Sequence, residues 1–263
     1  MSTVRTVVLA PLYLTGRWIG DFVAEFGRFS LVMGRVFSEF GAVFKRWDLF
    51  MYECVRLGLG SLPLVLVVGV FAGAVSGWQL HYQLEGYVPY DLLGPGIFKS
   101  IVLEMGPVLT GLVIAGRVAA SIAAEIGTMR VTEQIDALES MAISSTRYLA
   151  VPRIAAMTVM MPVLTAQANF IGVMGAWFVT TVFLNLTSAQ FWGLIPAFFH
   201  VYDVLSGLLK SCFFGMSAAM IGCYVGFQTS GGAEGVGSST INAFVWSSLA
   251  VLVLDYMLAM ILF

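Results

Sequence analysis

Charged residues are scarce in this chain of 263 residues: Asp, Glu, Lys and Arg together make up 11% of it. A soluble domain carries about 25% charged residues. Hydrophobic residues reach 59%, and the mean hydropathy is +0.91. The composition therefore excludes a soluble globular protein and predicts an integral membrane protein. The net charge of −2 leaves no basic face to follow phosphates, which excludes a nucleic-acid partner.

Cysteine and histidine are also rare, which limits metal and catalytic chemistry. The three cysteines show no CxxC spacing, so neither a zinc nor an iron–sulfur site is expected. Cys212 and Cys223 lie about 16 Å apart along one predicted helix, too far for a disulfide. Both histidines, His81 and His200, are expected in outer loops without a nucleophile nearby. We expect no enzyme activity, no metal and no cofactor in this chain.

Long apolar runs predict five membrane-spanning helices, because a span needs about 20 predominantly apolar residues. The predicted spans are Leu57–Leu80, Ile101–Ile126, Ile154–Leu186, Val204–Phe227 and Ile241–Phe263. No internal repeat and no linker divides them. Residues 57–263 are therefore expected to form one all-α, five-span domain.

Residues 1–56 show a different pattern. Aromatic and apolar residues recur at steps of three and four, and charged residues recur on the opposite side. The apolar stripe comprises Phe22, Phe26, Phe29, Met33, Phe37, Phe40, Phe44 and Trp47, and the polar stripe Arg17, Asp21, Glu25, Arg28, Arg35, Glu39 and Arg46. This pattern predicts an interfacial helix that lies along the membrane surface over residues 1–47.

The distribution of basic residues predicts the orientation. Seven basic residues precede the first predicted span, and Arg130, Arg147 and Arg153 flank the connection between spans two and three. The opposite side holds only Lys99 and, at a helix end, Lys210. We expect a multi-pass protein of the bacterial inner membrane with a cytosolic N-terminus and a periplasmic C-terminus.

Several charges fall inside the predicted spans, where they usually mark a cavity, a pathway or an ion pair. Glu104 precedes Gly106-Pro107, a helix-kinking pair. Two interpretations of Glu104 stay open: it lines a polar cavity, or it pairs with Lys210 at similar depth. Arg117, Glu125 and Asp255 are predicted to have structural roles within the membrane.

The connections after the second and the fourth predicted spans are candidate contact or binding sites. Thr132–Ala142 predicts a cytosolic coupling helix capped by Thr132, with Glu133, Asp136 and Glu139 as acidic residues and Ile135 and Leu138 as its apolar face. The glycine-rich stretch Gln228–Thr240 contains no GxxxxGK[ST] motif. It is expected to be a turn that ends in a serine or threonine cap at 238–240.

Several of these stretches together resemble one family, the MlaE/YrbE permeases. The motifs are Glu104-Met-Gly-Pro-Val, Ala115–Ala120, Ala124–Glu139, Tyr148–Arg153, Gly207–Ser211, Gly222–Phe227, Gly231–Gly237 and Leu254-Asp-Tyr. The resemblance extends from about Leu57 to the C-terminus. Two positions depart from the family pattern: Leu103 stands where many relatives carry a basic residue, and Ser238–Asn242 contains none.

The resemblance implies a permease subunit of an ABC system that moves phospholipid between the inner and outer membranes and so maintains outer-membrane lipid asymmetry. It further implies a homodimer, cytosolic ATPase subunits that bind ATP and magnesium, and a periplasmic MCE-domain protein. Glu104 and Lys210, with Met105 beside them and Trp78 and Tyr82 near the rim, are the implied lipid-cavity residues.

Two other classes remain as alternatives. An ion-gradient-driven secondary transporter would use Glu104 and Asp255 as proton sites, although the chain lacks the internal symmetry that such transporters often show. A membrane-embedded lipid-modifying enzyme would need a catalytic constellation, which the sequence does not offer.

Overall fold

The computed structural model describes all residues except 1–19, 21–23, 26, 42–45, 85 and 88. Every regular element in the described part is helical, and five helical segments are long and apolar enough to cross a membrane. They run over Trp47–Leu84, Tyr90–Val131, Thr146–Val182, Val201–Phe227 and Gly232–Leu262. The predicted all-α, five-span membrane fold is confirmed, and most spans are longer than their apolar runs indicated.

The first three spans are chains of shorter helical pieces. The first comprises α2 (Trp47–Glu53), a π turn η2 (Cys54–Gly58), a 3-10 turn η3 (Leu59–Ser61) and α3 (Leu62–Leu84). The second comprises η4 (Tyr90–Leu92), α4 (Leu93–Ser100), η5 (Ile101–Met105), α5 (Gly106–Ile114), η6 (Ala115–Ala119) and α6 (Ala120–Val131). The third comprises η7 (Thr146–Ala150) and α8 (Val151–Val182). His81 lies within α3, so its predicted loop position was wrong.

The last two spans are single helices, α11 (Val201–Phe227) and α12 (Gly232–Leu262). The predicted turn over Gln228–Thr240 was wrong for most of its length, because α12 begins at Gly232 rather than after a cap at 238–240. Gly231 has φ 89° and Gly232 has φ 68°, a left-handed conformation that glycine adopts without steric cost. These two residues complete the reversal of direction, which leaves residues 233–240 free to be helical.

Glycines bring α3 and α8 into backbone contact. A Cβ on Gly73 would lie 1.8 Å from the carbonyl oxygen of Gly172, and one on Gly69 would lie 2.9 Å from that of Ala168. Small residues permit this close approach between helices in a membrane, where van der Waals packing replaces the hydrophobic effect. We call the contact of Gly69, Gly73 and Gly77 with Ala168, Gly172 and Ala176 the glycine seam.

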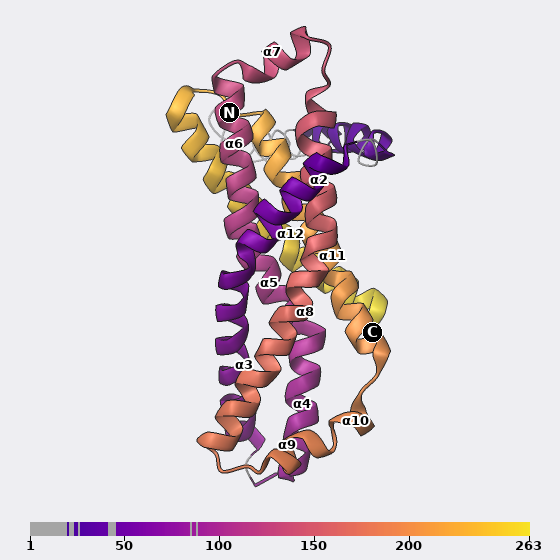
Figure 1. The fold of residues 1–263 in the computed structure, drawn as a ribbon, viewed down its shortest axis with the longest axis vertical. Helices are drawn as coiled ribbons and strands as arrows, with labels where there is room; N and C mark the ends of the chain where they lie inside the picture. Colours follow the sequence, from indigo (N-terminus) through magenta and orange to yellow (C-terminus); the bar gives the residue numbers. More distant parts are fainter. Residues whose placement is uncertain (1–19, 21–23, 26, 42–45, 85, 88) are drawn as a thin grey trace, which may run out of the picture.

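The N-terminal helix lies across one end of the bundle, beside α2 (Figure 1). Its described residues are helical over 27–38, and Met33 and Val36 are buried against the core. The Tyr224 hydroxyl donates a hydrogen bond of 2.6 Å to the Glu25 carboxylate, and this bond lowers the pKa of Glu25. The predicted stripe residues Arg17, Asp21, Phe22, Phe26 and Phe44 lie outside the described residues.

Short helices occupy both ends of the bundle (Figure 1). The connection between spans two and three forms α7 (Gln134–Ser140), and the connection between spans three and four forms α9 (Ser188–Gly193) and α10 (Ile195–Phe198) at the opposite end. The predicted helix Thr132–Ala142 was too long. Thr132 ends α6 and donates its hydroxyl to Thr128, while Glu133 and Ala142 adopt left-handed backbone conformations on either side of α7.

Candidate functional site

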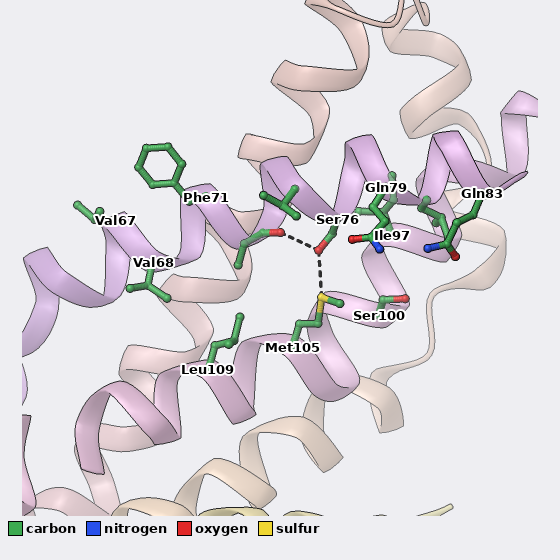
Figure 2. A pocket seen from close by; sticks show the side chains of 13 residues that line it. Val67, Val68, Phe71, Ser76, Gln79, Gln83, Ile97, Ser100, Met105 and Leu109 are labelled. Atoms are coloured by element: carbon green, nitrogen blue, oxygen red, sulfur yellow. Dashed lines mark hydrogen bonds between the residues drawn. The ribbon is translucent and has the colours of Figure 1, made fainter. Parts of the chain in front are cut away.

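A cavity of about 630 Å³ lies between α3 and the η5–α5 part of span two (Figure 2). Its lining is apolar along most of its length and polar at one end. The apolar residues are Val67, Val68, Phe71, Ala72, Val75, Leu80, Ile97, Met105 and Leu109, and the polar ones Ser76, Gln79, Gln83 and Ser100. Ser76, Gln79 and Gln83 lie in the second half of α3, and Ser100 ends α4 (Figure 2).

Local structure explains how the two walls meet. Ser76 donates 2.7 Å to the carbonyl of Ala72 and lies 3.0 Å from the Met105 sulfur, so its hydroxyl joins α3 to η5 (Figure 2). Pro107 cannot donate to the carbonyl four residues earlier, and the structure has the π turn η5 at this point. The predicted perturbation at Gly106-Pro107 therefore takes the form of a π turn, which widens the helix beside the cavity.

A charge cluster around a buried lysine joins η5, α11 and α12, and we call it the outer cluster. Lys210 of α11 is completely buried, and its Nζ lies 2.6 Å from Glu104 Oε1 and 3.1 Å from Asp255 Oδ1. Three spans contribute one residue each. The pairing of Glu104 with Lys210 is therefore present, and the Glu104 side chain is 46% exposed but does not line the cavity. The outer cluster carries a formal charge of −1.

The five residues predicted at a lipid cavity are not all brought together. Met105 lines the cavity, and Glu104 precedes it in η5. Glu104, Lys210, Trp78 and Tyr82 are absent from the lining; Trp78 and Tyr82 point outward from α3 and are 52% and 76% exposed. Sequence reasoning missed Ser76, Gln79 and Gln83. Their spacing along α3 was the available signal, because polar residues recur there every three or four positions in an otherwise apolar helix.

A second charge cluster joins the first three spans at the end where α7 lies, and we call it the inner cluster. Arg56 donates two hydrogen bonds to Glu125, of 2.8 and 2.5 Å, and its Nε lies 3.2 Å from Glu53. Arg153 lies 3.4 Å from Glu53 and 3.0 Å from Glu125. The formal charges of the four residues in the inner cluster sum to zero. Glu125 was predicted to be structural; its partners Glu53, Arg56 and Arg153 were missed as residues of an ion network.

Arg117 lies apart from both clusters. Its guanidinium donates a hydrogen bond to the hydroxyl of Ser61, and it forms no ion pair with any residue that the structure describes. Arg117 and Glu125 share one side of span two, as their spacing of eight residues indicated.

The α7 residues divide into a buried and an exposed set. Ile135 is buried and Leu138 packs against the core of the same chain, so the predicted apolar docking face is already covered. Glu133, Asp136 and Glu139 are exposed; Asp136 pairs with Arg130, and Glu139 accepts a hydrogen bond of 2.8 Å from Ser145. The surface that α7 presents is therefore acidic.

Comparison with known proteins identifies the family. The family model described as Permease MlaE matches residues 50–261. A probable ABC transporter permease protein of Rickettsia typhi is 36% identical over 95% of this chain and 96% of its own length. A probable ABC transporter permease protein of Synechocystis is 36% identical over 94% of this chain and 92% of its own.

A third relative has a more specific description. The intermembrane phospholipid transport system permease protein MlaE of Haemophilus influenzae is 32% identical over 94% of this chain and 95% of its own length. This relative therefore matches nearly the whole length of the chain. The chain belongs to the MlaE permease family.

Proposed function

We propose that this chain is the permease subunit of an ABC transporter that moves phospholipid between the inner and outer membranes and thereby maintains outer-membrane lipid asymmetry. The amphiphilic cavity between α3 and η5–α5 carries the proposal. Membership of the family and the description of the Haemophilus influenzae relative support it. No described feature favours an ion-gradient-driven transporter.

The chemistry of the cavity suits a phospholipid. Its volume of about 630 Å³ falls within the usual range of small-molecule sites. The apolar side chains, such as Val67, Phe71 and Leu109, suit acyl chains. The polar end offers Ser76, Gln79 and Gln83, which both donate and accept hydrogen bonds and so suit a headgroup with its ester and phosphate oxygens.

The open side of the cavity and the two ends of the bundle are the surfaces where we place partner subunits. The cavity opens to the outside of the chain, and we infer that a second copy closes it in a homodimer. We place ATPase subunits, which bind ATP and magnesium, at the acidic surface of α7. An MCE-domain protein fits the opposite end, near α9 and α10. Arg130 and Arg147 flank α7, which supports a cytosolic N-terminus and a periplasmic C-terminus in the inner membrane.

A cavity-filling substitution tests the function. Val75→Trp places a large ring in the cavity, whereas Val159→Trp places the same ring on an exposed position of α8 outside it. With its ATPase partner in proteoliposomes, the Val75→Trp protein should lose most phospholipid transfer to acceptor vesicles. Val159→Trp should retain it. Equal transfer by the two variants would refute the cavity as the transport site.

A charge reversal tests the α7 surface. Glu133→Lys changes an exposed residue that forms no ion pair with described residues, and Asp91→Lys makes the same change at the other end of the molecule. Leu138→Asp is less suitable, because Leu138 packs on the core of its own chain. Glu133→Lys should reduce copurification of the ATPase while Asp91→Lys should not. An unchanged yield of ATPase with Glu133→Lys would contradict the assignment.

A further inference from the structure

A second cavity, of about 290 Å³, lies between the same two spans as the first. Its lining comprises Arg56, Leu57, Arg117, Val118, Ser121 and Glu125, from η2, η6 and α6. Met105 and Leu109 line the first cavity, and Arg117, Ser121 and Glu125 line the second, all at intervals of four or eight residues along span two. Both cavities therefore lie between spans one and two. We call them the outer and the inner cavity.

The inner cavity contains one positive charge without a described counterion. Arg56 is neutralised by Glu125 and Glu53, and these residues together with Arg153 form the balanced inner cluster. Arg117 is exposed and has only the neutral hydroxyl of Ser61 as a partner among described residues. An unpaired cation within a membrane span is costly, and an anionic ligand would remove that cost.

The surroundings hold the guanidinium in place without covering it. A Cβ on Gly60 would lie 3.2 Å from Arg117 Nη2, so glycine at this position leaves room for the guanidinium against the backbone of η3. Ser121, one helical turn further along, is exposed on the same side and offers a hydroxyl donor. A planar guanidinium fork beside a hydroxyl suits the paired oxygens of a phosphate group.

The lining around Arg117 favours one source of that phosphate. Leu57 and Val118 add buried apolar surface beside the guanidinium. A charged group set against apolar side chains suits a ligand that carries hydrocarbon of its own, which a phospholipid does and a free phosphate does not.

We propose that the inner cavity is a binding site for the phosphate group of a phospholipid, held by Arg117 and Ser121. The site is separate from the outer cavity and does not depend on the transport function. Its phosphate lies at the level of Ser61 and Arg117, and its acyl chains extend out of the cavity into the hydrocarbon.

Photocrosslinking tests the proposal on the full chain in phosphatidylethanolamine nanodiscs. The probe is phosphatidylglycerol with a diazirine close to the glycerol, and adducts are mapped by mass spectrometry. Adducts within 55–64 and 113–121 report the inner cavity, and adducts within 71–83 report the outer one. Arg117→Gln should reduce the inner adducts at least about tenfold, because a charge-assisted contact is lost, and leave the outer adducts unchanged. The exposed arginine variant Arg147→Gln should change neither.

One competitor and one control probe distinguish a phospholipid from a free phosphate or a lipid without phosphate. Inorganic phosphate should not displace the inner adducts, and a diacylglycerol probe with the same chains and diazirine should not form them. Displacement by phosphate alone, inner adducts with diacylglycerol, or no inner adducts in the unmodified protein would overturn the proposal. Inner adducts unaffected by Arg117→Gln would also overturn it. If Arg117→Gln disturbs both sets of adducts, Arg117→Lys provides the deciding test. Lysine keeps the positive charge but lacks the planar guanidinium fork. Unchanged inner adducts in the Arg117→Lys protein would refute the site.

Discussion

The inner and outer charge clusters lie in the same membrane-spanning bundle but are built differently. The inner cluster pairs two arginines with two glutamates; each arginine contacts both glutamates, and Arg56 makes two hydrogen bonds to Glu125. The outer cluster shares one lysine between two carboxylates, one of which is half exposed. A balanced, multiply bonded network holds helices together, whereas an unbalanced pair with one accessible carboxylate can exchange partners. The comparison indicates that the inner cluster stabilises the fold, whereas the ion pairs of the outer cluster can rearrange.

The most disruptive test removes one arginine from the inner cluster. Arg153→Met leaves Glu53 and Glu125 with Arg56 alone, and Glu53 is buried. Removing one partner of a buried ion network costs about 3–5 kcal/mol, so the free energy of unfolding in detergent should fall by that amount. Arg147→Met is the control, because Arg147 is exposed and lies 3.9 Å from Glu39; its loss should cost less than about 1 kcal/mol. Similar losses for both variants would remove the distinction between the clusters.

A smaller stability effect is expected at the outer cluster. Glu104→Gln keeps the shape of the side chain and leaves Lys210 with Asp255 at 3.1 Å, so the cluster becomes neutral. The free energy of unfolding should change by no more than about 1 kcal/mol, as for an exposed ion pair. Phospholipid transfer should fall at normal protein levels, and cells should become sensitive to detergent. A collapse in protein level that Lys210→Met restores would instead make Glu104 a structural partner.

The smallest effect concerns a carboxylate outside the spans. The Tyr224 hydroxyl stabilises the charged form of Glu25 and lowers its pKa from the usual 4.5. A lowered pKa contributes stability that is complete above pH 4.5 and is lost as the pH falls through the lowered value. A spin label at Gly34, where an added Cβ meets nothing within 4 Å, should therefore become more mobile only below about pH 4.5. Tyr224→Phe should abolish this pH dependence, and an identical profile in that variant would contradict the assignment.

The sequence predicted the number and order of the spans because hydropathy averages over a whole helix and tolerates local errors. Ends were less accurate where a helix continues past its apolar run. Residues 233–240 are polar or small and look like a loop, yet they extend α12 once Gly231 and Gly232 have reversed the chain. Backbone conformations at two glycines decide that boundary, and composition does not report them.

The candidate site was predicted in part, because intramembrane charges are conspicuous and their partners are not. Lys210 was named as a possible partner of Glu104, since both are charged residues at similar depth. Arg153 was placed beside the connection between spans two and three, and Glu53 was not singled out, because the partner of each lies on another helix. The outer cavity depends on how α3 leans against η5, a tertiary feature with no local signal.

The glycine seam has a mechanical consequence for the outer cavity. Along the seam α3 and α8 pack backbone against backbone, so sliding one helix past the other would bring backbone atoms into collision. The cavity wall that α3 forms therefore does not move relative to span three. The opposite wall contains the π turn η5, where the helix lacks its regular hydrogen-bond pattern. Any change in cavity volume must then come from span two, and stiffening η5 would hold the cavity at one size.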